Sequence, residues 1–150
     1  WIFLSLFYQK FNFRTSLLNQ IKATNNPQQL EEYFGQIYQD LSAHSEAEEE
    51  VVYPVMRPYY QNVQHLYDEQ ATIKQLLEQI KAMNPENTAT FKAAIENLIT
   101  ALTAHISEEE KDMFPFIRHN FSDAQQEQMA TDFTTAKSKI QDQRLAATSH

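Results

Sequence analysis

Apolar residues recur at alternating steps of three and four along most of this chain, the spacing that gives an amphipathic α-helix one buried stripe. Polar stretches interrupt the pattern at residues 24–28, 54–62 and 84–88. The pattern predicts four amphipathic helices with short connections, followed by a fifth over roughly residues 122–142. Helices joined by short connections pack as antiparallel neighbours. We therefore expect an all-α fold, an up-down-up-down four-helix bundle with an additional C-terminal helix.

Each of the first four predicted helices carries one stripe of residues that should face the core. In the first it comprises Leu4, Phe7, Phe11, Arg14, Leu18 and Ile21. In the second it comprises Leu30, Phe34, Ile37, Leu41, His44, Glu48, Val51 and Val55. In the third it comprises Val63, Leu66, Gln70, Ile73, Leu77 and Ile80. In the fourth it comprises Phe91, Ile95, Leu98, Leu102, His105, Glu109, Asp112 and Phe116. The polar members are candidates for function, because burying a polar group without a partner is costly.

The composition agrees with a helical fold. The chain of 150 residues has one Gly, five Pro and no Cys, so it lacks the turn residues that a sheet requires. Two helix starts are visible in the sequence. Asn26 reads as an N-cap with Pro27 in the first turn and Gln29 as capping-box partner. Ser122 reads as a second N-cap, with Gln125 three residues on.

The length fits a single domain. We expect residues 1–143 to form the bundle with its closing helix, and residues 144–150 to form a flexible tail. The opening WIFLSLFY is apolar but too short to cross a bilayer, and no basic stretch precedes it, so no targeting segment is predicted. The chain begins with Trp rather than Met, from which we expect the original start to lie elsewhere.

Charge and cysteine content argue against several classes of partner. The formal net charge is −8 and the pI is about 5.0, whereas nucleic acids and anionic membranes select for clustered Lys and Arg. We expect no nucleic acid and no membrane as partner, and no motif names a protein partner. Without Cys there are no disulfides, thiolate nucleophiles or cysteine-ligated metals. This is compatible with a reducing compartment, and we expect a cytoplasmic protein.

One stretch of sequence occurs twice. AHSEAEEEVVYP at residues 43–54 returns as AHISEEEKDMFP at residues 104–115. Each copy holds His and Glu four residues apart, which places both side chains on one helix face about one turn apart. Each also ends in an aromatic residue and Pro (Tyr53-Pro54 and Phe114-Pro115), and we expect each Pro to bend or end its helix. Two similar helix pairs are therefore predicted.

Imidazole and carboxylate together suit iron, manganese or zinc, and a bridging carboxylate suits a two-metal centre. A single HxxxE is weak evidence, because such pairs are common on solvated helix faces. Two copies on buried stripes are more specific, since burying carboxylates without a cation costs several kcal/mol. The alternative is a polar core layer in which His and Glu hydrogen-bond to each other.

The doubled HxxxEExxx[YF]P within a four-helix pattern resembles the hemerythrin-like, or HHE cation-binding, domain over roughly residues 5–138. The resemblance implies a non-haem di-iron centre inside the bundle, and binding or sensing of dioxygen, iron or redox state. It also implies that each repeated helix gives one His and one bridging carboxylate. These would be His44, Glu48, His105 and Glu109.

The resemblance also implies one further His in the first and third helices, each after an acidic residue. The matching positions hold Phe11, preceded by Lys10, and Gln70, preceded by Glu69. Phe11 cannot bind a metal, and the Gln70 amide is a weaker donor for iron than imidazole. His65 is an alternative ligand, but it lies five residues from Gln70, about 140° around the helix. We therefore expect a depleted site that holds one or two ions.

Three further residues lie near those altered positions. Tyr8 and Tyr67 each lie three residues before Phe11 and Gln70, and Arg14 lies one turn beyond Phe11. We expect Tyr8, Tyr67, Phe11 and Arg14 to line the pocket, with the tyrosines more typical of packed aromatics.

Three functions remain open. The leading hypothesis is a hemerythrin-like metal-binding protein with iron as cofactor, and Mn, Zn or no metal as alternatives; its partners are the metal ion and dioxygen. The second is a non-haem metal oxidase or oxygenase that uses the open coordination positions. The third is a metal-free bundle that acts as an interaction or regulatory module. Enzymatic activity is undecided, binding is favoured over catalysis, and no catalytic residue or substrate is identified.

Overall fold

The computed structural model describes residues 15–148, and their regular elements are all helical, as the sequence predicts. Residues 15–23 form the first helical segment. The elements that follow are α2 (Pro27–Ala47), η1 (Glu48–Val52), α3 (Tyr53–Met56), α4 (Val63–Lys81), α5 (Thr88–Glu108), η2 (Glu109–Met113), α6 (Phe114–Asn120) and α7 (Asp123–Thr148). The η elements are single π-helical turns inside otherwise α-helical rods.

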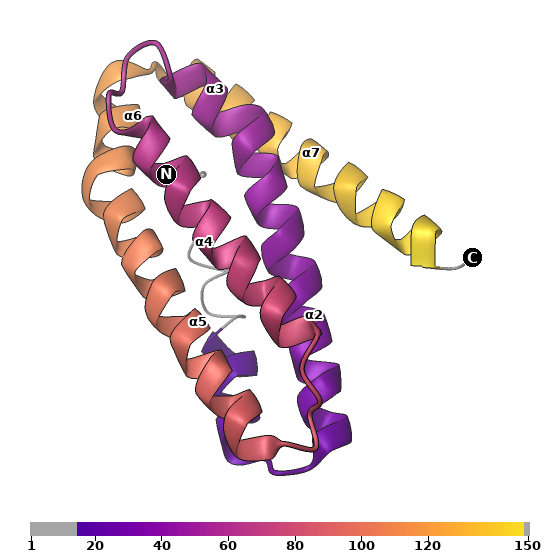
Figure 1. The fold of residues 1–150 in the computed structure, drawn as a ribbon. Coiled ribbons are helices and arrows are strands. Elements are labelled where there is room, and N and C mark those ends of the chain that lie inside the picture. Colours follow the sequence, from indigo (N-terminus) through magenta and orange to yellow (C-terminus); the bar gives the residue numbers. More distant parts are fainter. Residues whose placement is uncertain (1–14, 149–150) are drawn as a thin grey trace.

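The long helices lie side by side with alternating directions (Figure 1). The chain runs up α2 and α3, down α4, up α5 and α6, and down α7. Helix α4 packs against α5 and α2, and α7 packs along α2 and η1. The up-down-up-down arrangement of four helices stays a prediction, because its first helix would include residues 1–14, which lie outside the described residues.

Both predicted helix starts carry side-chain caps. The Asn26 Oδ1 accepts hydrogen bonds from the backbone N–H groups of Gln28 (2.9 Å) and Gln29 (3.2 Å), and Pro27 occupies the first turn of α2. The expected capping box at this end is wrong, because the Gln29 side chain accepts a hydrogen bond from Thr24 instead. At α7 the box is complete: the Ser122 N–H donates to Gln125 Oε1 (2.8 Å) and the Gln125 N–H to Ser122 Oγ (3.1 Å).

The predicted stripes match the buried faces up to one point in each repeat. Every predicted member of the α4 stripe is buried, and so are the stripes of α2 and α5 as far as Glu48 and Glu109. Beyond these residues the prediction is wrong by one position. Val55 is 44% exposed whereas Met56 is fully buried. Likewise Asp112 is exposed whereas Met113 is buried.

The π-helical turns cause this shift. A π-turn closes with a bond between residues five apart rather than four, so it adds one residue to the turn. The Tyr53 N–H bonds to the Glu48 carbonyl, and the Phe114 N–H bonds to the Glu109 carbonyl. The prediction used 3.6 residues per turn throughout. After each π-turn the buried positions therefore lie one residue later in the sequence than predicted.

The two prolines follow these turns directly. Pro54 and Pro115 lie in the first turn of α3 and α6. Within a continuous α-helix a Pro would lose one hydrogen bond, and its ring would clash with the carbonyl four residues earlier. The preceding π-turn offers a wider backbone path, and each Pro then starts a new α-helical segment. The prolines thus mark a local change of helix type, where the sequence predicted a bend or an end.

A polar layer separates two apolar clusters. One cluster includes Leu41, Ile73 and Leu102, and the other includes Ala47 and Leu66 together with apolar residues of η2, α6 and α7. Within α4, Gln70 lies between Leu66 of one cluster and Ile73 of the other. His105 and Glu109 lie in the corresponding part of the α5–η2 rod. The site is therefore enclosed by apolar packing on both sides.

Helix α7 continues to Thr148, past the boundary expected at residue 143. The flexibility expected of residues 144–150 stays a prediction. None of the helices described in residues 15–148 has the length and hydropathy needed to span a bilayer.

Candidate metal centre

Two helix rods each supply one His and one Glu to the polar layer. His44 lies in the last turn of α2 and Glu48 opens η1, while His105 lies in the last turn of α5 and Glu109 opens η2. The spacing of four residues points each pair to one side of its rod. All four residues are buried, with exposures of 4%, 1%, 3% and 2% in the order given. The structure thus places every ligand assigned by the resemblance inside the protein.

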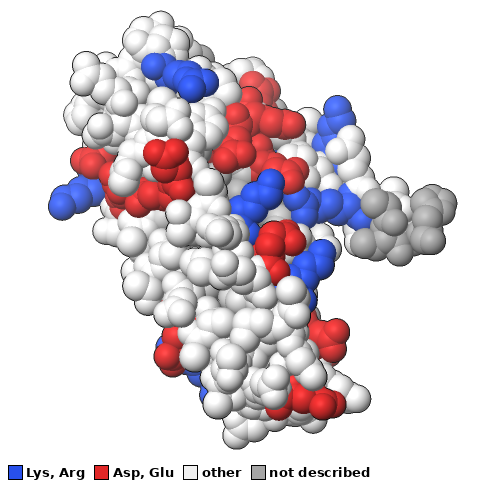
Figure 2. Space-filling view, viewed as in Figure 1, with Lys and Arg blue, Asp and Glu red and all other residues white. Residues whose placement is uncertain are grey.

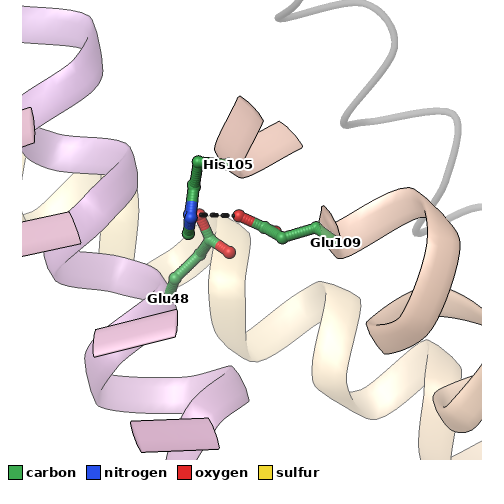
Figure 3. A group of neighbouring side chains, drawn as sticks. All are labelled: Glu48, His105 and Glu109. Carbon is green, nitrogen blue, oxygen red and sulfur yellow. Dashed lines mark ion pairs between the residues drawn. The ribbon is translucent and has the colours of Figure 1, made fainter. Parts of the chain in front are cut away.

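Three of these side chains converge. One ligand atom each from Glu48, His105 and Glu109 lies within 4.8 Å of the others, and Figure 3 shows Glu48 pointing from one rod toward His105 and Glu109 of the other. The His105 Nε2 lies 2.5 Å from Glu109 Oε1. His44 joins the group through Glu48, with its Nε2 2.8 Å from Glu48 Oε1. The converging group thus offers one nitrogen and two carboxylate donors, and His44 adds a second nitrogen beside Glu48.

The electrostatics of this volume disfavour two free carboxylates. The pKa of Glu48 is raised from 4.5 to about 7, chiefly by burial and then by the neighbouring charge of Glu109, while His44 opposes the rise. A carboxylate that is costly to ionise in an apolar surrounding is stabilised by a nearby positive charge. A cation beside Glu48 and Glu109 would therefore stabilise their charged forms.

Buried oxygens without hydrogen-bond partners also favour a cation at this place. The Glu48 Oε2 and the Gln70 Oε1 are buried and have no hydrogen-bond partner within the described part of the chain. Buried polar atoms without partners are uncommon, and each calls for a reason. A cation beside Glu48 would satisfy its oxygen, and imidazole with carboxylate suits iron, manganese or zinc. The residues present therefore fit a metal ion.

Gln70 takes the position where the resemblance expects a His. It is 3% exposed, and its Nε2 donates to Glu48 Oε1 (3.2 Å) and to the Tyr53 hydroxyl (2.7 Å). Its amide nitrogen thus occupies part of the polar layer, which leaves its oxygen as the group available to a metal. Gln70 therefore lies at the site, and its role as a weaker ligand stays a prediction.

Glu69 orients His105. Its Oε1 lies 3.1 Å from His105 Nδ1, so it holds that nitrogen as the protonated one and leaves Nε2 toward the site. This carboxylate–histidine pairing is usual behind a metal-ligating imidazole. The sequence offered one signal for this role, the acidic residue retained before Gln70.

His65 lies outside the buried group. Its side chain is 56% exposed, and its Nε2 lies 3.0 Å from Glu108 Oε2 and 3.6 Å from Glu69 Oε2. These three form a second, more exposed group of potential donors. The structure therefore does not bring His65 to Glu48, His105 and Glu109.

Two tyrosines extend the layer. Tyr67, expected to line the pocket, packs edge-on against Tyr53 with ring centroids 5.0 Å apart. Tyr53 is fully buried and its hydroxyl lies 3.3 Å from His105 Nε2. The sequence showed Tyr53 only as half of an aromatic–Pro pair, so its place at the site was missed. Tyr8, Phe11 and Arg14 lie outside the described residues.

Comparisons with known proteins agree with this site. The family described as hemerythrin HHE cation binding domain matches residues 11–117. This range covers all four candidate ligands and most of the chain.

Two relatives are similar over most of the chain. A "DNA nickase" of Nostoc sp. is 50% identical over 131 residues, which cover 86% of this chain and 37% of that protein. An uncharacterized hemerythrin-like protein of Schizosaccharomyces pombe is 29% identical over 122 residues, which cover 78% of this chain and 60% of that protein. The chain thus spans less than two thirds of each relative. No solved structure matches.

Proposed function

Because this chain belongs to the hemerythrin HHE cation-binding domain family, we propose that it binds a metal ion through His44, Glu48, His105 and Glu109. The observation that carries the proposal is the convergence of Glu48, His105 and Glu109 within 4.8 Å in a buried layer. Two carboxylates at such a place without a cation would reduce the stability of the fold by several kcal/mol.

Non-haem iron is the metal we propose, as one ion or a pair, with manganese and zinc as alternatives. The donor set of two imidazoles and two carboxylates suits all three. When bound, iron would allow the domain to bind dioxygen reversibly or to sense how much iron is available. Gln70 in place of a His weakens the set, so we propose a partly depleted site rather than a strong dioxygen carrier.

The residues of this chain prepare the site in three ways. Glu69 keeps the His105 Nδ1 protonated, so that Nε2 is free to bind. The two apolar clusters on either side exclude water, which strengthens every charge interaction between them. Gln70 donates to Glu48 Oε1 and thereby fixes the direction of that carboxylate.

Elemental analysis of the natively purified protein tests the proposal. We expect about one to two iron atoms per chain in the wild type and none in His105→Ala. His119→Ala is the matched control, because His119 is exposed and lies beyond η2 in α6. Equal metal content in His105→Ala and wild type would remove the assignment.

Metal content, together with oxygen consumption, also distinguishes the two alternative functions, the metal-free module and the oxidase or oxygenase. A wild type without metal would favour a metal-free interaction or regulatory module, in which Gln70 fills the polar layer. One metal per chain together with substrate-dependent oxygen consumption would favour an oxidase or oxygenase. No residue at the site identifies a substrate, so binding is the function we propose first.

We further propose that nucleic acid is not a ligand of this domain, although one relative bears the name DNA nickase. The net charge of −8 opposes a polyanion. On the face drawn in Figure 2, basic side chains lie among acidic ones. The matched region is 37% of that relative, so its named activity can depend on the remainder. Nicking of supercoiled plasmid by the wild type and not by His105→Ala would contradict this proposal.

A further inference from the structure

We propose that the Tyr53 hydroxyl is an additional metal ligand at this site, replacing in part the nitrogen that is missing at Gln70. The inference rests on the proposed metal binding and assigns one more donor to it. Three features carry it: the backbone turn that directs Tyr53, the contacts of its hydroxyl, and the difference between the two repeats.

The π-turn η1 directs Tyr53 into the site. Along a regular α-helix, a residue five positions after Glu48 would lie about 140° away around the axis. In η1 the Tyr53 N–H bonds to the Glu48 carbonyl, so Tyr53 lies one turn beyond Glu48 on the same face. Single π-turns inside α-helices occur often at functional sites. The π-turn η1 thus shifts the buried stripe by one residue and also brings the Tyr53 phenol beside Glu48.

The Tyr53 hydroxyl lies among the donors of the site. It is 2.7 Å from Gln70 Nε2 and 3.3 Å from His105 Nε2. The side chain has no exposed surface, and its ring packs edge-on against Tyr67. The oxygen is therefore held beside His105, and the buried ring has little freedom to move it elsewhere.

The two repeats differ at this position. Phe114 takes the place of Tyr53 in the second repeat: it follows η2 as Tyr53 follows η1, and it too bonds to the Glu five residues before it. Both aromatic rings are buried, so a Phe at position 53 would fill the same space, and packing alone does not require the hydroxyl. The hydroxyl occurs on the ring of Tyr53, where it lies 2.7 Å from Gln70 Nε2. An oxygen donor is thus added where a nitrogen donor is absent.

Binding would exchange a proton for the metal. Metal ligands bind in their deprotonated form, and binding releases their protons. The phenol O–H bond breaks, an oxygen–metal bond forms, and the proton passes to solvent with no change of oxidation state.

Ferric iron is the probe for this ligand, because ferric phenolates absorb visible light whereas carboxylates and imidazoles with ferric iron do so weakly. Wild type, Tyr53→Phe and Tyr67→Phe would be loaded with ferric iron, and iron per chain, visible absorption and resonance Raman spectra recorded. Tyr67→Phe is the matched control, because it also removes one phenol hydroxyl and keeps the ring that packs on Tyr53.

We expect the wild type and Tyr67→Phe to show a phenolate charge-transfer band with its ring vibrations. Tyr53→Phe should lose both, and its iron dissociation constant should rise about tenfold or more. An unchanged band per iron in Tyr53→Phe, or a wild type that holds iron without the band, would overturn the assignment of Tyr53 alone. A wild type that binds no iron would overturn this inference together with the proposed function.

Discussion

Glu48 and Glu109 are acidic residues enclosed in an apolar surrounding, where most proteins place neutral side chains. Each is paired with the His one turn earlier on its own rod, and Glu69 adds a third carboxylate behind His105. The acidic groups thus outnumber the imidazoles. At the residue scale, the site is a cluster of buried carboxylates of the kind that a nearby positive charge stabilises.

The raised pKa of Glu48 predicts how the metal-free protein responds to pH. A carboxyl with a pKa of about 7 when folded and 4.5 when unfolded binds its proton more tightly in the folded state. Stability from this group is therefore present below pH 4.5 and is lost as pH rises toward 7. The loss is on the order of 3 kcal/mol, from 1.36 kcal/mol per pKa unit.

Urea unfolding of chelator-treated protein between pH 5 and 8 measures this effect. Glu48→Gln should remove most of the fall in unfolding free energy, because its neutral amide does not titrate. The exposed Glu50→Gln serves as control and should follow the wild type. Identical pH profiles for wild type and Glu48→Gln would show that Glu48 does not carry the effect.

At the element scale, each rod is an α-helix interrupted by one π-turn at the site. The turns begin at Glu48 and Glu109 and end before an aromatic–Pro pair. They change which residues face the core, so Met56 and Met113 are buried where the α-helical period selects Val55 and Asp112. The caps at the starts of α2 and α7 are easier to predict than the π-turns, because they are formed by residues close together in the sequence.

The capping box of α7 predicts a measurable contribution to stability. Ser122→Ala would leave the backbone N–H of Gln125 without its acceptor, and the loss of an N-cap costs about 1 kcal/mol. Ser138→Ala is the matched control, because Ser138 is exposed in the middle of α7 and Ala favours a helix interior. Thermal and urea unfolding should show a loss for the first variant and none for the second. Equal stabilities would contradict the role of Ser122.

At the scale of the whole molecule, α7 closes the site on the His44 side. The Phe133 ring lies 5.0 Å from the His44 ring in an edge-on contact. One turn further along α7, Lys137 Nζ lies 2.9 Å from Asp40 Oδ1 of α2, and both side chains are buried. Arg144 makes a second, more exposed pair with Glu46. The pairs set the register of α7 on α2.

The buried pair predicts an asymmetric response to mutation. Lys137→Ala removes one partner and leaves the buried charge of Asp40 uncompensated, so we expect a loss of about 3–5 kcal/mol in unfolding free energy. Replacing both residues, as Asp40→Leu with Lys137→Met, should cost far less, because apolar groups of similar volume often substitute for a buried ion pair without loss.

Arg144→Ala is the control for this prediction. Its pair with Glu46 is partly solvated, and such surface pairs contribute about 1 kcal/mol or less. Urea unfolding of the three variants and wild type gives the comparison. A double variant as unstable as Lys137→Ala would show that the pair stabilises the fold beyond compensating its own burial.

Local pattern was sufficient for much of this protein. The helices, the caps at Asn26 and Ser122, and the buried faces up to Glu48 and Glu109 all follow from residues within about one turn of each other. The HxxxE spacing likewise identified four residues that share a buried layer, because His and Glu four apart point the same way on a helix. Gln70 also stood out as the polar residue on an apolar stripe.

The tertiary structure decided what depends on neighbouring rods. The choice between an α-turn and a π-turn after Glu48 is small in local energy, so packing around it determines the outcome, and Tyr53 reaches the site only through that turn. The contact of Glu69 with His105 and of Lys137 with Asp40 joins residues far apart in sequence. The sequence thus determined which candidate ligands are buried, because that depends on the helix period, and the packing of helices determined which groups contact and orient them.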